Sequence, residues 1–210
     1  MRRALYGRLN PFWPMGKRLF DICSSFVVLA LIWPFMLIIA LVVMFSSRGG
    51  VFFTQIRVGR NEKEFKLFKF RTMRVDSEEK GQLTIGGDDP RITGTGHFLR
   101  KFKLDELPQL FNVLGGSMSV VGPRPEVRKY TDLYTEEQRQ VFAVRPGLTD
   151  YASIEYFAEN ELLGRSEDPN RTYTEEVMPA KLKLNLQYID ERGFVTDLKI
   201  IFKTLGKIFS

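Results

Sequence analysis

The chain has 210 residues, 44% of them hydrophobic, and a formal net charge of +6. This length suits one compact domain with an accessory segment and leaves little room for a second full domain. A single cysteine, Cys23, excludes disulfides within the chain and cysteine metal sites, and a single histidine, His97, excludes multi-histidine metal sites. The positive charge indicates an acidic partner, which is anionic lipid, nucleic acid or a phosphorylated substrate.

The distribution of charge at the N-terminus favours lipid. The first acidic residue, Asp21, follows five basic residues: Arg2, Arg3, Arg8, Lys17 and Arg18. They lead directly into an apolar segment, Ile22 to Phe45, which is long enough to cross a membrane as one straight helix. This pattern is typical of a membrane flank, and we expect no nucleic-acid partner. A cleaved signal peptide is disfavoured because the run is too long and no small-residue cleavage site follows.

Pro34 lies near the middle of the apolar segment. Proline removes a backbone hydrogen bond, so the segment is either a kinked span or two short helices that form a re-entrant hairpin. Basic residues also follow the segment, and the positive-inside bias therefore favours both of its ends on the cytoplasmic face. We expect residues 1–48 to form a basic N-terminus with a re-entrant membrane helix, and residues 49–210 to form a cytoplasmic domain.

Residues 51–73 predict a β-hairpin, because two apolar-rich strands flank a turn at Gly59 to Glu62. Lys69 and Arg71 are two residues apart, so on an extended strand they face the same side. They either contact phosphate oxygens or belong to a solvated strand face.

The run from Leu104 to Pro125, LDELPQLFNVLGGSMSVVGPRP, begins with two adjacent carboxylates. Asp105 has the position of a helix N-cap and Glu106 that of the first helical residue. A carboxylate there meets the positive end of the helix dipole, stays ionised and can act as a nucleophile. Neighbouring helical residues point about 100° apart, so the two acids are expected to have separate roles. Ordinary helix capping is the alternative explanation.

Two arginines near this pair are candidate phosphate ligands. Arg124 stands between Pro123 and Pro125, which fix the backbone and present the guanidinium with little freedom left to lose. Arg100 precedes Asp105 by five residues. A proline-stiffened turn and a helix-surface arginine are the respective alternatives.

The remaining chain predicts mainly helices. Glu126 to Arg145 has an amphipathic helical pattern, and Glu175 to Arg192 predicts a helix that stops near Gly193. From Thr196 to Phe209, apolar residues recur at helical spacing beside lysines. That pattern fits an interfacial membrane helix and equally a C-terminal helix packed on the core. The predicted fold class is α/β, mostly helical and membrane-associated, with a small β-hairpin and amphipathic interfacial helices.

The Leu104–Pro125 run resembles the signature of the monotopic phosphoglycosyl transferases, the bacterial polyprenyl-phosphate sugar phosphotransferase family. In that family an Asp-Glu dyad lies in a run like LDELPQLFNVL and is followed by a GPRP turn. Lys17 to Asp21 is similar to the family's KR-x-x-D pattern, in which Asp21 would cap the helix start or pair with a cation. Val144 to Asp150, VRPGLTD, is similar to the family's VRPGITG loop. The resemblance covers nearly the whole chain.

Two residues depart from the family pattern. Trp33 precedes Pro34 where serine is common, so a hydroxyl that would bond the freed backbone is missing, whereas the helix break remains. Asp150 stands where glycine is usual, and this weakens any inference about which sugar is bound.

The resemblance implies a transferase that moves a sugar-1-phosphate from a UDP-sugar to polyprenyl (undecaprenyl) phosphate and releases UMP. Asp105 would form a covalent phosphosugar-aspartyl intermediate, and Glu106 would deprotonate or orient the lipid phosphate. Mg2+ is the implied cofactor, with Asp105 its expected ligand. Four cationic side chains would neutralise the diphosphate: Arg71, Arg100, Arg124 and Arg145.

The resemblance also implies a monotopic protein of the bacterial inner membrane with its catalytic domain, residues 49–210, on the cytoplasmic face. Such enzymes initiate the synthesis of surface glycoconjugates such as exopolysaccharide or lipopolysaccharide. Membrane lipid is then a partner, and a homodimer is left open. Two other classes remain as alternatives: a non-enzymatic membrane adaptor, and a phosphohydrolase with an aspartyl nucleophile and water as acceptor.

Overall fold

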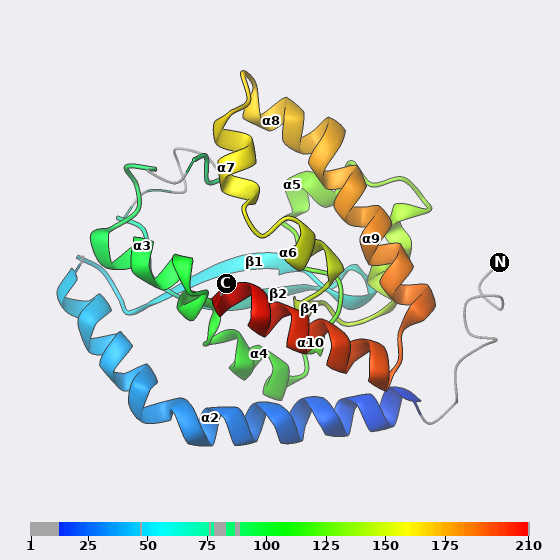
Figure 1. Ribbon diagram of the computed structural model, residues 1–210, viewed down its shortest axis with the longest axis horizontal. Coiled ribbons are helices and arrows are strands. Elements are labelled where there is room, and N and C mark those ends of the chain that lie inside the picture. The colour runs from blue at the N-terminus through cyan, green and yellow to red at the C-terminus, as the bar shows by residue number, and fades with distance from the viewer. Residues whose placement is uncertain (1–12, 47, 76, 78–82, 87–88, 210) are drawn as a thin grey trace.

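The computed structural model describes residues 13–46, 48–75, 77, 83–86 and 89–209. The described chain is mostly helical and contains two two-stranded sheets. Its longest element, α2 (Trp13–Ser46), lies along one side of the molecule, and the remaining elements pack above it (Figure 1). The predicted mostly helical class with a small sheet is confirmed. Arg2, Arg3 and Arg8 of the predicted membrane flank lie outside the described residues.

Helix α2 continues through Pro34, and Figure 1 shows it bending along its length. The described structure therefore has one bent helix where two short helices were one of the expectations, as proline inside a helix allows. A narrow stripe of α2, including Leu29, Ile39 and Val43, packs against the domain. Most of its other large apolar side chains are exposed, and α2 is the described helix that is long and apolar enough to cross a membrane.

The predicted hairpin is confirmed. Strand β1 (Phe52–Val58) pairs antiparallel with β2 (Glu64–Phe70) around the 3-10 turn η1 (Arg60–Glu62). Strand β2 lies against helix α4 (Gln109–Gly115), where Asn112 reaches across to the strand. Its Oδ1 accepts from Phe68 N at 3.0 Å, and its Nδ2 donates to Lys66 O at 2.7 Å. These bonds fix the register between the strand and α4.

A second sheet joins two proline-containing loops. Strand β3 (Ser119–Val121) pairs parallel with β4 (Gly147–Thr149). Gly122, just after β3, and Gly147, the first residue of β4, meet so closely that a Cβ on Gly147 would lie 2.1 Å from Gly122 N. Only glycine fits this contact. The GPRP turn and the VRPG loop are consequently held side by side.

The short helices connect these parts. Their bounds are α3 (Gly94–Lys101), η2 (Leu104–Glu106), α5 (Arg128–Thr131), η3 (Gln138–Ala143), α6 (Tyr151–Glu155), α7 (Glu159–Gly164), α8 (Pro169–Thr172) and η4 (Tyr173–Val177). The expectation of one amphipathic helix over Glu126 to Arg145 is wrong. Thr135 and Gln138 form a reciprocal capping box, at 2.9 and 3.3 Å, that starts a new turn between α5 and η3.

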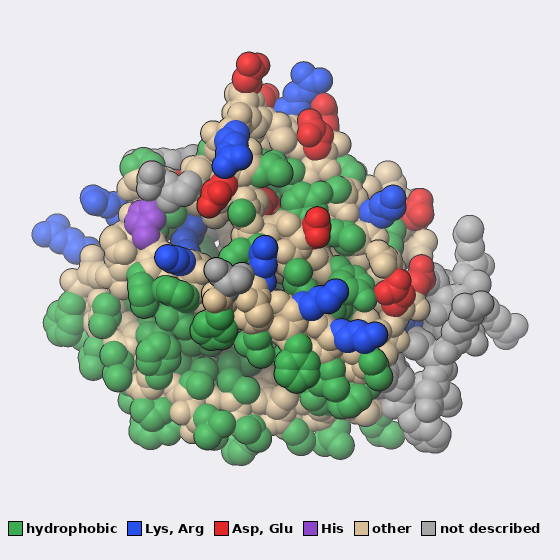
Figure 2. Space-filling model, in the orientation of Figure 1, with side chains coloured by type: hydrophobic (Ala, Val, Ile, Leu, Met, Phe, Trp, Pro, Cys, Tyr) green, Lys and Arg blue, Asp and Glu red, His purple; other side chains and the backbone are tan. Residues whose placement is uncertain are grey.

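The last two helices complete the main core. Helix α9 (Met178–Glu191) ends just before Gly193, as predicted, and α10 (Phe194–Phe209) follows it. One face of α10 buries Asp197 and Ile200 in the domain, and the other leaves Phe202 and Phe209 exposed. Both expected features therefore occur in α10: a core-packing face and an apolar outer face. Figure 2 shows hydrophobic side chains gathered over the half of the molecule that contains α2 and α10.

The KR-x-x-D residues attach the start of α2 to the domain. Lys17 Nζ lies 2.5 Å from Asp197 Oδ2 and 4.0 Å from Asp21 Oδ1. Asp21 lies inside α2 and accepts from Ser119 Oγ and Val120 N, both at 3.1 Å. The expectation that Asp21 caps the helix start is therefore wrong, and the alternative, pairing with a cation, is what the structure shows.

Candidate active site

The Asp-Glu pair lies in a 3-10 turn rather than at a helix cap. Lys103 adopts the left-handed conformation, with φ 55°, and its N–H donates to Arg100 O at 3.1 Å, which closes helix α3. The turn η2 then carries Asp105 and Glu106, and α4 begins only at Gln109. The expectation that Asp105 is the N-cap is thus wrong, because Lys103 is the residue that precedes the turn and Asp105 lies inside it. Both carboxylates are buried, with 5% and 8% of their surface exposed.

Glu106 is held by two cations. Arg124 grips it with both guanidinium ends, Nη2 on Oε1 and Nη1 at 3.2 Å from Oε2. Lys69 Nζ donates to Oε1 at 3.1 Å. Burial alone would raise the pKa of Glu106, but the charges of Arg124 and Lys69 outweigh it and hold this pKa well below its usual range. Glu106 is therefore ionised and holds the side chains of Lys69 and Arg124 in place.

Asp105 is paired far less completely. Its Oδ2 lies 3.9 Å from Lys69 Nζ, and its buried Oδ1 has no hydrogen-bond partner among the described residues. Burial raises the pKa of Asp105, Lys69 opposes that rise and the charge of Glu106 adds to it. A carboxylate oxygen without donors keeps its electron pair available, so this is the member of the pair that is suited to attack an electrophile.

Lys69 lies near both acids of the dyad. The sequence left open whether it contacts phosphate or lies on a solvated strand face. Strand β2 carries its side chain to the dyad, and burial lowers the pKa of Lys69 against the opposing effect of Glu106 and Asp105. Arg71 lies beyond the end of β2, and its Nη2 donates to Phe52 O at 3.5 Å. The two cations were expected on one strand face, but the structure brings only Lys69 to the carboxylates. The strand ends at Phe70, between the two residues, and a correct prediction of this boundary would have distinguished Lys69 from Arg71.

The other two predicted arginines lie at different ends of α4. Arg100 donates from Nε to Thr72 Oγ1 at 2.8 Å and from Nη1 to Thr84 Oγ1 at 3.0 Å. It lies in α3, which packs against the turn η2 that carries the dyad. Burial lowers the pKa of Arg100, and the charge of Asp105 opposes that shift. Arg145 instead donates from Nε to Gly116 O at 2.9 Å, at the C-terminal end of α4. The assignment of phosphate binding to these arginines stays a prediction.

The backbone of the GPRP turn is fixed by Asp150. Pro123 and Pro125 have no N–H, so Arg124 supplies the single backbone donor of this tripeptide. That N–H donates to Asp150 Oδ2 at 3.0 Å, and Asp150 Oδ1 accepts from Ser153 N at 2.6 Å. Asp150 is fully buried. The residue that departs from the family pattern therefore holds the turn that presents Arg124.

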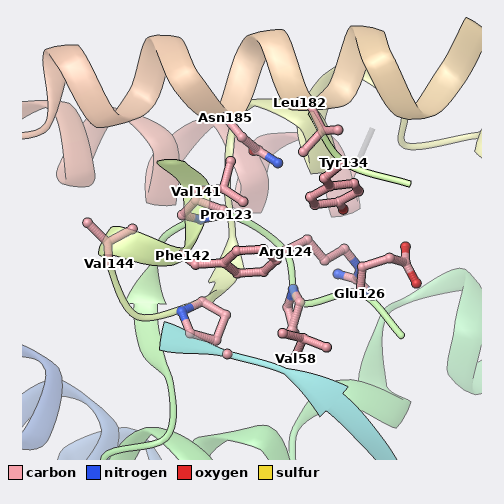
Figure 3. A pocket seen from close by; sticks show the side chains of 13 residues that line it. Val58, Pro123, Arg124, Glu126, Tyr134, Val141, Phe142, Val144, Leu182 and Asn185 are labelled. Atoms are coloured by element: carbon pink, nitrogen blue, oxygen red, sulfur yellow. The ribbon is translucent and has the colours of Figure 1, made fainter. Parts of the chain in front are cut away.

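A pocket lies between this turn and helix α9 (Figure 3). Arg124, Tyr134, Phe142, Leu182 and Asn185 are among the side chains that line it. Most of its lining is apolar core, and neither acid of the dyad borders it. The pocket is thus a space behind the turn, separate from the carboxylates at which the chemistry is expected.

A divalent cation would find one protein ligand here. Within the described residues there is no group of three His, Cys, Asp or Glu side chains that could hold a metal ion. Mg2+, however, is commonly bound by one or two carboxylates together with substrate phosphates and water. The carboxylate of Asp105, which is less completely paired than that of Glu106, fits such a site, which the substrate would complete. Asp105 as a Mg2+ ligand stays a prediction.

Comparison with known proteins places the chain in a family. The model of the family described as bacterial sugar transferase matches residues 12–210. The chain is 40% identical to the uncharacterized sugar transferase EpsL of Bacillus subtilis over 91% of this chain and 86% of that protein. It is also 40% identical to UDP-glucose:undecaprenyl-phosphate glucose-1-phosphate transferase of Escherichia coli, over 92% of this chain and 40% of that protein.

A third relative is UDP-N-acetylgalactosamine-undecaprenyl-phosphate N-acetylgalactosaminephosphotransferase of Aeromonas hydrophila, 34% identical over 96% of this chain and 45% of that protein. The chain thus spans most of the Bacillus relative but less than half of the other two. The family match covers the dyad, the hairpin and the GPRP turn together. This chain belongs to the bacterial sugar transferase family.

Proposed function

We propose that this protein transfers a sugar-1-phosphate from a UDP-sugar to undecaprenyl phosphate and releases UMP. The observation that carries this proposal is the unequal pairing of two adjacent buried acids: Asp105 keeps a free oxygen while Glu106 is held by Lys69 and Arg124. The printed names of the Escherichia coli and Aeromonas relatives, which specify UDP-sugar and undecaprenyl phosphate, support it. Relatives named as exopolysaccharide production proteins support a role in surface glycoconjugate synthesis.

In the first half of the reaction, Asp105 Oδ1 attacks the phosphorus linked to the sugar. An oxygen–phosphorus bond forms to Asp105, the bond from that phosphorus to the bridging oxygen breaks, and its electron pair leaves with UMP. The product is a phosphosugar-aspartyl intermediate. Lys69 and Arg124 stand beside the carboxylates, where they neutralise charge on the diphosphate.

In the second half, an oxygen of undecaprenyl phosphate attacks the same phosphorus and the Asp105 carboxylate leaves. The low pKa of Glu106 makes it a weak proton acceptor, so its role is to orient Lys69 and Arg124 toward the incoming lipid phosphate. Of the two roles that the resemblance implied for Glu106, deprotonating or orienting the lipid phosphate, this favours orientation. Asp105 would hold Mg2+, and the bound ion would supply positive charge to the phosphate groups.

The membrane arrangement follows from where the lipid phosphate lies. The phosphate of undecaprenyl phosphate is at the membrane interface, so the dyad must reach that depth. A bent α2 that enters and leaves on the cytoplasmic side of the inner membrane would place it there, with the exposed face of α10 against lipid. The bend in α2 and the exposed apolar side chains of both helices support this topology.

A nucleotide-release assay tests the proposed activity. The purified protein in detergent or vesicles is given a panel of UDP-sugars, with Mg2+, with and without undecaprenyl phosphate. We expect UMP and a lipid-linked sugar diphosphate from one or a few of the sugars. Release of free sugar phosphate without lipid would indicate the phosphohydrolase instead. No UMP from any sugar, from a protein that binds vesicles, would indicate the membrane adaptor.

The topology has its own test. Single cysteines are placed near Arg8 and near Arg60 in a Cys23→Ser background. Both should be protected from an impermeant thiol reagent in intact cells, and both should be labelled after lysis. Pro34→Leu restores a backbone hydrogen bond and straightens the helix, so some molecules should then span the membrane and expose the Arg8 site. Labelling of the Arg8 site in intact cells that retain Pro34 would show that the segment spans.

A further inference from the structure

Gln109 is buried beside the dyad with an unused donor. It is the first residue of α4, only 2% of its surface is exposed, and its Nε2 has no hydrogen-bond partner among the residues described. A buried amide without a partner lowers stability, and native proteins rarely keep one without a reason. Neither the fold nor the proposed roles of Asp105 and Glu106 uses this group.

The backbone brings Gln109 to within about one helical turn of Asp105. The 3-10 turn η2 leads through Leu107 and Pro108, both in the right-handed helical region, into α4. The backbone hydrogen bonds along this segment span three residues, so Gln109 lies a little more than one turn beyond Asp105. Asp105 Oδ1 is a buried acceptor without a partner and Gln109 Nε2 is a buried donor without one, yet no hydrogen bond joins them. Both groups are thus left for a third molecule.

We propose that Gln109 is a catalytic residue whose amide donates to a non-bridging oxygen of the sugar-linked phosphate while Asp105 Oδ1 attacks the phosphorus. This inference rests on the proposed function. A phosphate that reaches Asp105 presents its oxygens within about 3 Å of the attacking atom, so one of them can meet the neighbouring donor. An amide is also neutral, and it stabilises charge on the phosphate without adding a further cation beside Asp105.

The test uses the fact that a buried donor without a partner lowers the stability of the folded protein. Gln109→Met keeps nearly the same volume but removes the amide. Because an unpaired buried polar group is replaced by an apolar one, the melting temperature should stay equal or rise. The rate of UMP release in a single turnover should fall at least tenfold, in line with the loss of one donor to a developing charge. Gln109→Glu places a third carboxylate there and should reduce that rate further.

Tyr130→Phe is the matched control. Tyr130 is also 2% exposed with an unpaired buried hydroxyl, but it lies in α5 within the main core. Its removal should leave melting temperature equal or raised and leave the rate unchanged. This separates the effect of removing any unpaired buried group from the effect of removing the one beside Asp105.

Two results would overturn the inference. One is a Gln109→Met protein whose single-turnover rate stays within threefold of wild type. The other is a loss of stability or failure to fold in this variant, because that would show that the amide already has a structural partner. Failure of the proposed function looks different, because then the wild-type protein itself releases no UMP from any UDP-sugar.

Discussion

The two ends of helix α4 differ in how completely their polar groups are paired. At the C-terminal end, Arg18 donates to Val113 O at 2.6 Å and to Leu114 O at 2.8 Å, and Arg145 donates to Gly116 O. At the other end, Asp105 Oδ1 and Gln109 Nε2 have no partner in the described part of the chain. A helix end that is closed by arginines stabilises the fold. In the proposed function, the end with unpaired buried groups is the one that receives the substrate.

The largest effect is expected at the unpaired end. Asp105→Asn should abolish transfer, because an amide cannot form the bond to phosphorus. Turnover within about tenfold of wild type would contradict the assignment, since that is only about 1.4 kcal/mol of barrier. Turnover is measured as lipid-dependent UMP release, with circular dichroism as the control for folding.

The same substitution should stabilise the protein. The pKa of Asp105 is raised in the folded state, so its ionised form costs stability, and wild type loses stability as pH rises through that pKa. The gain from Asp105→Asn should therefore be absent below the unfolded-state value of about 3.9 and should grow as pH rises above it. Urea unfolding at several pH values measures it. A variant less stable than wild type at neutral pH would show that the carboxylate is well paired.

A smaller effect is expected at the cation that holds Glu106. Arg124→Lys keeps the charge but loses the planar two-pronged grip, so kcat/KM should fall at least about tenfold, or about 1.4 kcal/mol. Steady-state kinetics with the preferred UDP-sugar measures this. A near-normal kcat/KM would show that Arg124 only stabilises the proline-containing turn.

The smallest effect on activity is expected at the paired end. Arg145→Gln removes the hydrogen bond to Gly116 O and should cost about 1 kcal/mol of unfolding free energy. Its kcat/KM should stay within threefold of wild type, because the guanidinium lies at the end of α4 opposite the dyad. A loss of tenfold or more would instead support the sequence-based prediction that Arg145 contacts substrate phosphate.

The sequence predicted those features that depend on local pattern. The hairpin follows from apolar strands around a turn, and the end of α9 follows from Gly193. The chemistry that the motif implies for the dyad stays a prediction. The position of Asp105 was predicted wrongly because Lys103 takes a left-handed conformation, which lysine adopts rarely and no local pattern indicates.

Contacts between distant segments were beyond the sequence. Lys69 reaches the dyad because Asn112 bonds the backbone of β2, a contact that joins residues far apart in the chain. Asp150 likewise holds Arg124 only because two glycines let the two proline loops meet. Periodicity and motif spacing indicate neither of these contacts. That Lys69 and Arg124 both meet Glu106 is therefore known only from the fold.

The Glu106→Gln variant separates the proposed attack by Asp105 from the later step that Glu106 serves. Glu106→Gln is incubated with the preferred UDP-sugar and Mg2+ without lipid, and the intact protein and its peptides are weighed by mass spectrometry. We expect a stable addition of one sugar phosphate on the peptide that contains Asp105, with one UMP released per protein, and no addition in Asp105→Asn. UMP release by Glu106→Gln without any adduct, or an adduct on another residue, would contradict it.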